Sequence, residues 1–195
     1  MKTIYLILSS ILLIFLAACS ESESNTSDAA NDSLKRTTIV SDSTPKQSIP
    51  IAKSYTFVDK VNVVVEDSRL EPAQVQQEIR NAIAAVMQDK GYTYEPDLAK
   101  ADLVMGFLLA LESGVSDQQL IAKFGLSPGL VSLNSDGRYE KATLVVGAMA
   151  TDTETLYWKS MLQGFADFER ARDESERRLD TLVAQMLSDL PQAGQ

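Results

Sequence analysis

The hydrophobic pattern predicts two amphipathic helices, one near the middle of the chain and one near its carboxyl end. Apolar residues within Val75–Met87 follow one another at helical spacing, and a similar stripe recurs within Leu179–Leu190. Pro72 suits the first turn of the earlier helix, and Gly91 suits the position just past its end. Pro191 lies just beyond the later stripe. We therefore expect one helix to begin at Pro72 and a second to end before Pro191.

Runs of β-branched, aromatic and aliphatic residues predict the strands. Ser54–Phe57 and Val61–Val65 predict one interrupted strand or two short ones. Tyr92–Tyr94 predicts a short extended piece. Leu103–Leu111 contains no charged residue and is apolar at both alternating sets of positions, which is typical of a buried central strand.

Two later strands are separated by four polar residues, which predicts an antiparallel hairpin. These strands are expected at Tyr139–Ala150 and Thr155–Phe165. Alternation along the second strand places Leu156 and Trp158 on one face and Tyr157 on the other. We expect Trp158, the single tryptophan, to pack in the core rather than to stack on a ligand.

These elements predict an α+β fold in which a small, mostly antiparallel sheet packs against the two amphipathic helices. The folded domain is expected at residues 53–191, a length that can bury about two-thirds of the surface of its unfolded chain. Residues 19–52 are polar and lack a hydrophobic period, so we expect a disordered tether there. The apolar run Thr38-Ile39-Val40 within this tether is not predicted to be a strand.

An apolar insertion interrupts the regular alternation of strands and helices at residues 115–133. Ser116 and Gln119 have the spacing of a capping box and predict a short helix. Two interpretations of the apolar residues that follow remain open. In the first, which we favour because exposed apolar patches are rare on monomers, the segment folds back over one end of the sheet. Alternatively, Phe124, Leu126 and Leu130 bind a partner, because long connections in compact domains are often functional.

The amino-terminal segment has the layout of a secretory signal. Lys2 is followed by uncharged residues 4–18, a run that is short for a membrane-spanning helix. The ending Leu16-Ala17-Ala18-Cys19 resembles the bacterial lipoprotein box. The resemblance implies that residues 1–18 are a lipoprotein signal peptide and that Cys19 becomes an acylated first residue, carrying diacylglycerol and a further acyl chain such as palmitate. The alternative is an ordinary signal peptide with an incidental cysteine.

Lipidation of Cys19 also accounts for an unpaired cysteine in an exported chain, since this is the single cysteine of the sequence. Several acyl chains hold a protein stably at a membrane, whereas one chain binds only marginally. Ser20 replaces the aspartate that would resemble an inner-membrane retention signal. The resemblance therefore implies attachment to the outer membrane, with the domain facing the periplasm.

The amino-acid composition excludes several common kinds of catalytic and metal-binding site. The sequence has no histidine, so histidine-based triads, metal sites and general bases are excluded, and the single cysteine is assigned to lipid. Two carboxylate pairs, Asp97 with Asp102 and Asp152 with Glu154, are better explained as solvated surface than as acid/base or calcium sites. We predict no catalytic residue, no metal and no cofactor.

The charge distribution gives no sign of an anion site. The formal net charge is −9, which argues against a nucleic-acid partner. Arginines do gather in one segment, but acids alternate with them, and this pattern predicts a mixed-sign solvated face. The arginines of this segment are Arg170, Arg172, Arg177 and Arg178.

The order of motifs resembles the DUF4136 family of bacterial lipoproteins. The segments that carry the resemblance are Tyr55-Thr56-Phe57, Lys90-Gly91-Tyr92, Ala101-Asp102-Leu103-Val104, Ala142-Thr143-Leu144-Val145-Val146, Leu156-Tyr157-Trp158-Lys159-Ser160 and Leu190-Pro191. The resemblance covers residues 53–191 and implies a fold and a location. The family has no assigned function and therefore no catalytic residues to transfer.

Two functions from different classes follow as expectations. The first is an outer-membrane lipoprotein whose periplasmic domain binds an envelope protein or a cell-wall component without catalysis. The second is a carrier of a small apolar ligand, held between the helices and the sheet near Phe107, Trp158 and Phe165. An enzyme is not expected, because the sequence lacks the common pairs of nucleophile and base.

Overall fold

A computed structural model describes residues 36–43, 48–126, 129–132 and 137–195. The predicted signal peptide, Cys19 and much of the predicted tether lie outside these ranges. Within the described ranges, no helix combines the length and hydrophobicity that crossing a bilayer requires.

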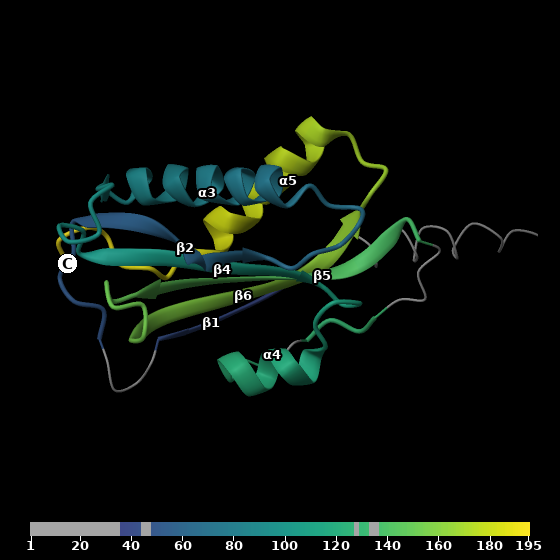
Figure 1. Ribbon diagram of the computed structural model, residues 1–195, viewed down its shortest axis with the longest axis horizontal. Coiled ribbons are helices and arrows are strands. Elements are labelled where there is room, and N and C mark those ends of the chain that lie inside the picture. Colours follow the sequence, from purple (N-terminus) through teal and green to yellow (C-terminus); the bar gives the residue numbers. More distant parts are fainter. Residues whose placement is uncertain (1–35, 44–47, 127–128, 133–136) are drawn as a thin grey trace, which may run out of the picture. The chain divides into compact units, whose positions relative to one another are not determined.

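A mixed sheet of six strands forms the centre of the domain (Figure 1). Its strand order is β1-β6-β5-β4-β2-β3. The strands are β1 (Thr38–Ser43), β2 (Ser54–Val64), β3 (Thr93–Tyr94), β4 (Leu103–Leu111), β5 (Tyr139–Met149) and β6 (Leu156–Asp167).

The α+β class is as predicted, but the sheet is mixed rather than mostly antiparallel. Neighbouring strands from β1 through β6 and β5 to β4 are antiparallel, whereas β2 is parallel to both β4 and β3. Helix α3 lies between β2 and the next two strands in the sequence. A helical crossover of this kind returns the chain to the same end of the sheet, so the strands that it connects run in the same direction.

Helices α3 (Pro72–Asp89) and α5 (Arg172–Met186) lie on one face of the sheet (Figure 1). Pro72 is at the start of α3, and Gly91 beyond its end has a φ of 86°, a conformation that glycine adopts at little cost. The apolar stripe of each helix is buried against the sheet. This main core includes Ile79, Ala82, Ile83 and Met87 from α3, Val183 and Met186 from α5, and Leu187 and Leu190 just after it.

The opposite face of the sheet carries one short helix, α4 (Asp117–Phe124) (Figure 1). Leu120 of α4 and Leu126 after it pack with Val145 of β5 and Met161 of β6 in a separate, smaller apolar cluster. Eight residues of helix cannot cover a face that two longer helices cover on the other side. Part of this second face is therefore left open.

Strand β1 is a correction to the sequence prediction, which placed residues 38–40 in a disordered tether. Thr38–Ser43 forms an antiparallel edge strand along β6, with Ile39 packed against the main core. The Ser41 hydroxyl donates a hydrogen bond of 2.9 Å to that of Ser160. The strand is short and polar, so its own sequence does not favour it; the exposed edge of β6 supplies the partner.

Strand β6 contains a second correction. The pairing of β5 with β6 shifts register next to Ala148, leaving Tyr157 as an extra residue between Leu156 and Trp158. Tyr157 and Trp158 both pack against the main core, whereas Leu156 contacts the open face instead. A bulge of this kind reverses the facing of the residues beyond it, which strict alternation cannot anticipate.

Asp102 joins the beginnings of β2 and β4. Its Oδ2 accepts hydrogen bonds from the amides of Lys53 (2.8 Å) and Ser54 (2.9 Å) and from the Ser54 hydroxyl (3.0 Å). These bonds, led by that from the Lys53 amide, lower the pKa of Asp102 despite a smaller opposing effect of burial. The carboxylate therefore has a structural role where the two parallel strands start.

We predict that Asp102→Asn lowers the free energy of unfolding by about 1 kcal/mol at neutral pH, because an exposed charge-assisted bond is weakened. A carboxyl group whose pKa is lowered by folding stabilises the fold above its unfolded pKa of about 3.9 and stops doing so as the pH falls through its folded value. The difference between variant and wild type should therefore shrink below about pH 4 in thermal melts. Exposed Glu66→Gln is the control, and a gap that persists at pH 2 would contradict the assignment.

Candidate functional site

Helix α4 begins and ends with well-formed caps. The Ser116 hydroxyl accepts a hydrogen bond from the Gln119 amide (3.4 Å), and the Gln119 side chain accepts one from the Ser116 amide (2.9 Å). This reciprocal arrangement confirms the predicted capping box. Gly125 ends the helix in the left-handed region, with a φ of 66°. Both caps are local, so α4 needs little help from the rest of the fold to define its limits.

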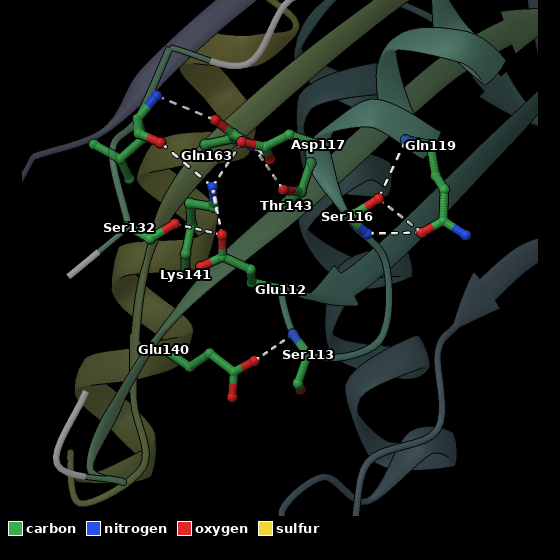
Figure 2. A network of polar contacts seen from close by, with 11 residues as sticks. Glu112, Ser113, Ser116, Asp117, Gln119, Ser132, Glu140, Lys141, Thr143 and Gln163 are labelled. Carbon is green, nitrogen blue, oxygen red and sulfur yellow. Dashed lines mark hydrogen bonds and ion pairs between the residues drawn. The ribbon is translucent and has the colours of Figure 1, made fainter. Parts of the chain in front are cut away.

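A buried lysine attaches α4 to the sheet (Figure 2). The side chain of Lys141, on β5, is 2% exposed, and its Nζ lies 2.8 Å from Asp117 Oδ2 and 3.0 Å from Glu112 Oε1. Burial alone would lower the pKa of Lys141, but the bonds to Asp117 and Glu112 outweigh it and raise the pKa. The ammonium group therefore stays charged and holds acids from two separate segments.

Gln163, on β6, extends this network toward the segment after α4 (Figure 2). Its Nε2 donates to Asp117 Oδ1 and to Thr143 Oγ1, both at 3.1 Å, and its Oε1 accepts from the Leu130 amide at 3.2 Å. The Leu130 carbonyl in turn accepts a bond of 3.4 Å from Lys141 Nζ. Ser132 bonds to Glu112. Residues 129–132 are thereby held against the sheet by polar contacts.

The three predicted partner-binding residues have different environments. Leu126 is 4% exposed and belongs to the small cluster beneath α4. Leu130 is half-buried, and its backbone atoms join the polar network. Phe124 is half-buried at the end of α4 and borders open space. Of the three residues, Phe124 is the one whose side chain both packs on the small cluster and lines this open space.

An apolar groove lies between α4 and the uncovered part of the sheet, and we call it the α4 groove. Its volume is about 270 Å³. Its apolar walls come from β2, β4, β5, β6 and the end of α4, and include Val61, Leu108, Phe124, Val145, Met149 and Leu156. The groove therefore joins residues that are far apart in the sequence.

Two glycines facing each other across β4 and β5 form part of the groove floor. Gly106 pairs with Gly147. A Cβ atom on Gly106 would lie 3.0 Å from the Val61 carbonyl oxygen and 2.8 Å from Met149 Cε. Glycine at this position lets the irregular part of β2 and the Met149 side chain approach the sheet closely.

Three lysines surround this apolar floor. Lys60, Lys123 and Lys159 all line the groove. Lys123 Nζ lies 5.5 Å from the centre of the Phe124 ring, and Lys159 Nζ lies 3.5 Å from a carboxylate oxygen of Asp42. The chain has a net charge of −9, so the positive charge of the lysines that border the groove is opposite in sign to the charge of the protein as a whole. Such a site favours ligands with acidic groups beside an apolar surface.

The carboxylate pairs considered from the sequence have structural partners. Asp152 Oδ1 accepts from the amides of Glu154 (2.8 Å) and Thr155 (3.2 Å) in the β5–β6 turn, and these bonds lower its pKa. Asp102 likewise has a lowered pKa. A general acid needs a raised pKa, so neither carboxyl group has the property that this chemistry requires. The described part of the chain holds no group of three or more potential metal-ligating His, Cys, Asp or Glu side chains.

Lys141, Gln163 and Asp117 were not predicted as a unit from the sequence. The sequence did contain an indication of a buried polar site. Lys141 and Thr143 interrupt the apolar alternation of β5, and Gln163 interrupts that of β6. Pairing of Thr143 with Gln163 across the two strands brings these polar residues to the same face. Register information was needed to join them to α4.

We predict that Lys141→Met lowers the free energy of unfolding by about 2–3 kcal/mol, because it leaves Asp117 and Glu112 close together without their shared cation. The loss falls below the 3–5 kcal/mol typical of a broken buried pair because both acids remain partly exposed. Lys100→Met, which removes a surface ion pair with Asp97, should cost less than about 1 kcal/mol. Denaturant unfolding measures both; equal losses would contradict a structural role for Lys141.

Solved structures similar to this chain share little of its sequence. The chain matches a solved DUF4136 family protein from Bacteroides thetaiotaomicron at 15% identity, with a TM-score of 0.48, over 78% of this chain and 94% of that one. It matches PelC, a dodecamer from Paraburkholderia phytofirmans, at 12% identity, with a TM-score of 0.47, over 82% of this chain and 100% of that one. It also matches 38% of a PDZ domain protein from Parabacteroides distasonis, over 82% of this chain, at 11% identity and a TM-score of 0.44.

No protein with a curated description matches the chain. The family model for the domain of unknown function DUF4136 matches residues 39–192. This match begins at the second residue of β1 and ends after α5, so it covers all the strands and helices described above except Thr38. The chain therefore belongs to the DUF4136 family.

Proposed function

We propose that this protein is a lipid-anchored lipoprotein of the outer membrane whose periplasmic domain binds a partner and catalyses no reaction. The observation that carries the binding function is the α4 groove, an apolar surface left open on one face of the sheet. The resemblance of residues 16–19 to a lipoprotein box supports the anchor. The absence of histidine from the sequence and the lowered pKa values of Asp102 and Asp152 favour binding over catalysis.

The groove has the features of a preorganised binding site. Lys141 and Gln163 fix α4 and residues 129–132 to the sheet, so the position of Phe124 is set before a partner arrives. A site that is already ordered loses less conformational entropy on binding. Aromatic side chains in such positions commonly contribute much of the binding energy.

The charges around the groove indicate the kind of partner. Lys60 and Lys123 would attract carboxylates, whereas Lys159 already has Asp42 as a partner, and the floor between the lysines would accept an apolar side chain. An envelope protein segment with acidic residues beside an apolar one meets both requirements, and so does a cell-wall component that carries carboxylates. We propose a partner of this type in the α4 groove.

We predict that Phe124→Ala weakens partner binding at least about tenfold, as expected for an aromatic anchor. Because Phe124 is half-buried, its truncation should cost only about 1–2 kcal/mol of stability, less than the 3–5 kcal/mol of a fully buried phenylalanine. Recovery of cross-linked partners from envelope extracts, together with thermal melts, measures both effects.

Ile121→Ala is the matched control for this experiment, since Ile121 is also on α4 but is 43% exposed and does not line the groove. It should leave partner recovery unchanged. A large loss of stability in Phe124→Ala with intact partner recovery would remove the α4 groove from consideration. Equal loss of recovery in both variants would do the same.

We predict that Cys19→Ala abolishes acylation and releases the protein from the outer-membrane fraction, either as a soluble form or as an uncleaved precursor. The physical reason is the loss of the acyl chains that make membrane attachment stable. Fractionation with metabolic labelling by a fatty acid measures both effects. Ser24→Ala is the control for the same segment, and unchanged labelling in Cys19→Ala would refute the anchor.

The second candidate function is a carrier of a small apolar ligand, and a cleft between the helices and the sheet favours it. Of the three aromatic residues suggested for this site, Phe165 lines that cleft. Phe107 and Trp158 are 3% and 2% exposed and are packed into the main core. The carrier site is therefore proposed at the cleft beside Phe165, on the face of the sheet opposite to the α4 groove.

A further inference from the structure

The cleft on the helical face of the sheet has mostly apolar walls, and we call it the helix cleft. Its volume is about 260 Å³. Side chains from α3, α5 and three strands line it, among them Val75, Leu144, Leu162, Phe165, Leu179 and Leu182. Small-molecule pockets usually have volumes of about 300–1,000 Å³, so this cleft fits a short chain rather than a large ring system.

The acids that border the helix cleft already have cationic partners. Glu78 pairs with Arg172 at 2.9 Å. Asp167 pairs with Arg138 at 3.0 Å and lies 3.8 Å from Arg170. The negative charges at the cleft are therefore matched by arginines other than Arg178.

Arg178 is the exception among the arginines at the start of α5. Arg172 and Arg177 form ion pairs with Glu176 and Asp173 along the helix. In the described part of the chain, Arg178 makes no hydrogen bond and no ion pair, although it is half-buried and lines the helix cleft. The mixed-sign solvated face predicted from the sequence is therefore an incomplete description of this segment.

The surroundings of Arg178 disfavour its charge. Burial lowers the pKa of its guanidinium, and the nearby charge of Arg170 lowers it further. The charge of Asp167 acts in the opposite direction but with the smallest effect of the three. Arginine nevertheless stays protonated in proteins, so Arg178 keeps its positive charge without a direct ion pair. Gly164 lies below the guanidinium, and a Cβ atom there would be 3.7 Å from Arg178 Nη2. It would also lie 3.2 Å from Thr37 Cγ2, so the absence of a side chain at Gly164 lets Thr37 and Arg178 both approach the sheet closely.

We propose that the helix cleft binds an anion with a short alkyl chain, the chain lying among the apolar side chains and the head group contacting Arg178. An anionic head group would supply the direct ion pair that Arg178 lacks, and charge-assisted bonds to arginine are among the stronger hydrogen bonds in proteins. The apolar walls would take up the alkyl chain. Arg170, which also lines the cleft, is placed to contribute a second positive charge.

This inference rests on the carrier, the second of the functions proposed above, and names its ligand class. Two sources offer the required chemistry: the carboxylate of a fatty acid and the phosphate of a lipid or alkyl phosphate. Arginine binds both groups with two parallel hydrogen bonds, so the shared feature is a negatively charged oxygen group on an alkyl chain.

The test measures the binding of four probes with the same alkyl chain to the full protein in phosphatidylcholine nanodiscs. The probes are octanoate, octyl phosphate, octan-1-ol and octyltrimethylammonium, titrated by calorimetry with empty nanodiscs as the reference. We expect the anions to bind at least about tenfold more tightly than the alcohol, and the cation to bind most weakly. Each methylene removed from the chain should weaken binding about fourfold. Hexanoate, which is two methylenes shorter than octanoate, should therefore bind about fifteenfold more weakly. If octanoate binds more tightly than octyl phosphate, the ligand class is a fatty acid; if octyl phosphate binds more tightly, it is a lipid or alkyl phosphate.

Arg178→Gln should weaken octanoate binding about tenfold or more and leave octanol binding within about twofold. Arg177→Gln, which removes the same charge from the adjacent exposed position, should change neither. Arg178→Gln should also leave unchanged, or raise, the melting temperature of the ligand-free protein, because it removes a half-buried charge that has no partner. A purely structural arginine would show the opposite effect on stability.

The outcomes separate this inference from the function on which it rests. Equal binding of octanoate and octan-1-ol would support an apolar carrier and overturn the role of Arg178. Equal loss of octanoate binding in Arg177→Gln and Arg178→Gln would also overturn that role. No binding of any probe would overturn the carrier function together with this inference. None of these results bears on the α4 groove, which lies on the other face of the sheet.

Discussion

The central sheet has two apolar faces, and both must be kept from water for the fold to be stable. Leu103, Val104 and Met105 follow one another along β4, point alternately to the two faces, and are all fully buried. Helices α3 and α5 meet this requirement on one face with two continuous apolar stripes. On the other face, α4 and residues 129–132 do so only in part, and polar contacts with Lys141 and Gln163 hold them in place. The α4 groove follows directly from this uneven coverage.

The elements that sequence analysis predicted well carry their signal within a single segment. The apolar stripe of α3, the uninterrupted apolar run of β4 and the capping box of α4 each depend on residues close together in the chain. Local periodicity and capping determine such elements whatever packs against them. The hairpin of β5 and β6 was also predicted from nearby residues, because only a short polar turn separates its two strands in the sequence.

The elements that were missed depend on partners distant in the sequence. Strand β1 exists because it pairs with β6, more than a hundred residues later, and its own composition is that of a polar tether. The parallel direction of β2 follows from the crossover through α3 rather than from any residue in β2. The bulge at Tyr157 reverses the expected facing of Leu156, and that single reversal moves an apolar side chain from the main core to the α4 groove. Phe124 was identified from its apolar surroundings in the sequence, whereas the role of Lys141 required the register of three segments.

The arginine segment shows why sequence and structure give different answers about charge. Alternating arginines and acids predict mutual pairing, and Arg170, Arg172 and Arg177 do have acidic neighbours. Arg178 falls on the side of α5 that lines the helix cleft, where Asp167, the acid that attracts it, already pairs with Arg138. The whole sequence contains 27 acids and only 18 lysines and arginines, so an acid is easily available to most cations. A half-buried arginine left without one in such a chain lowers stability, and an anionic ligand at the helix cleft would compensate for that cost.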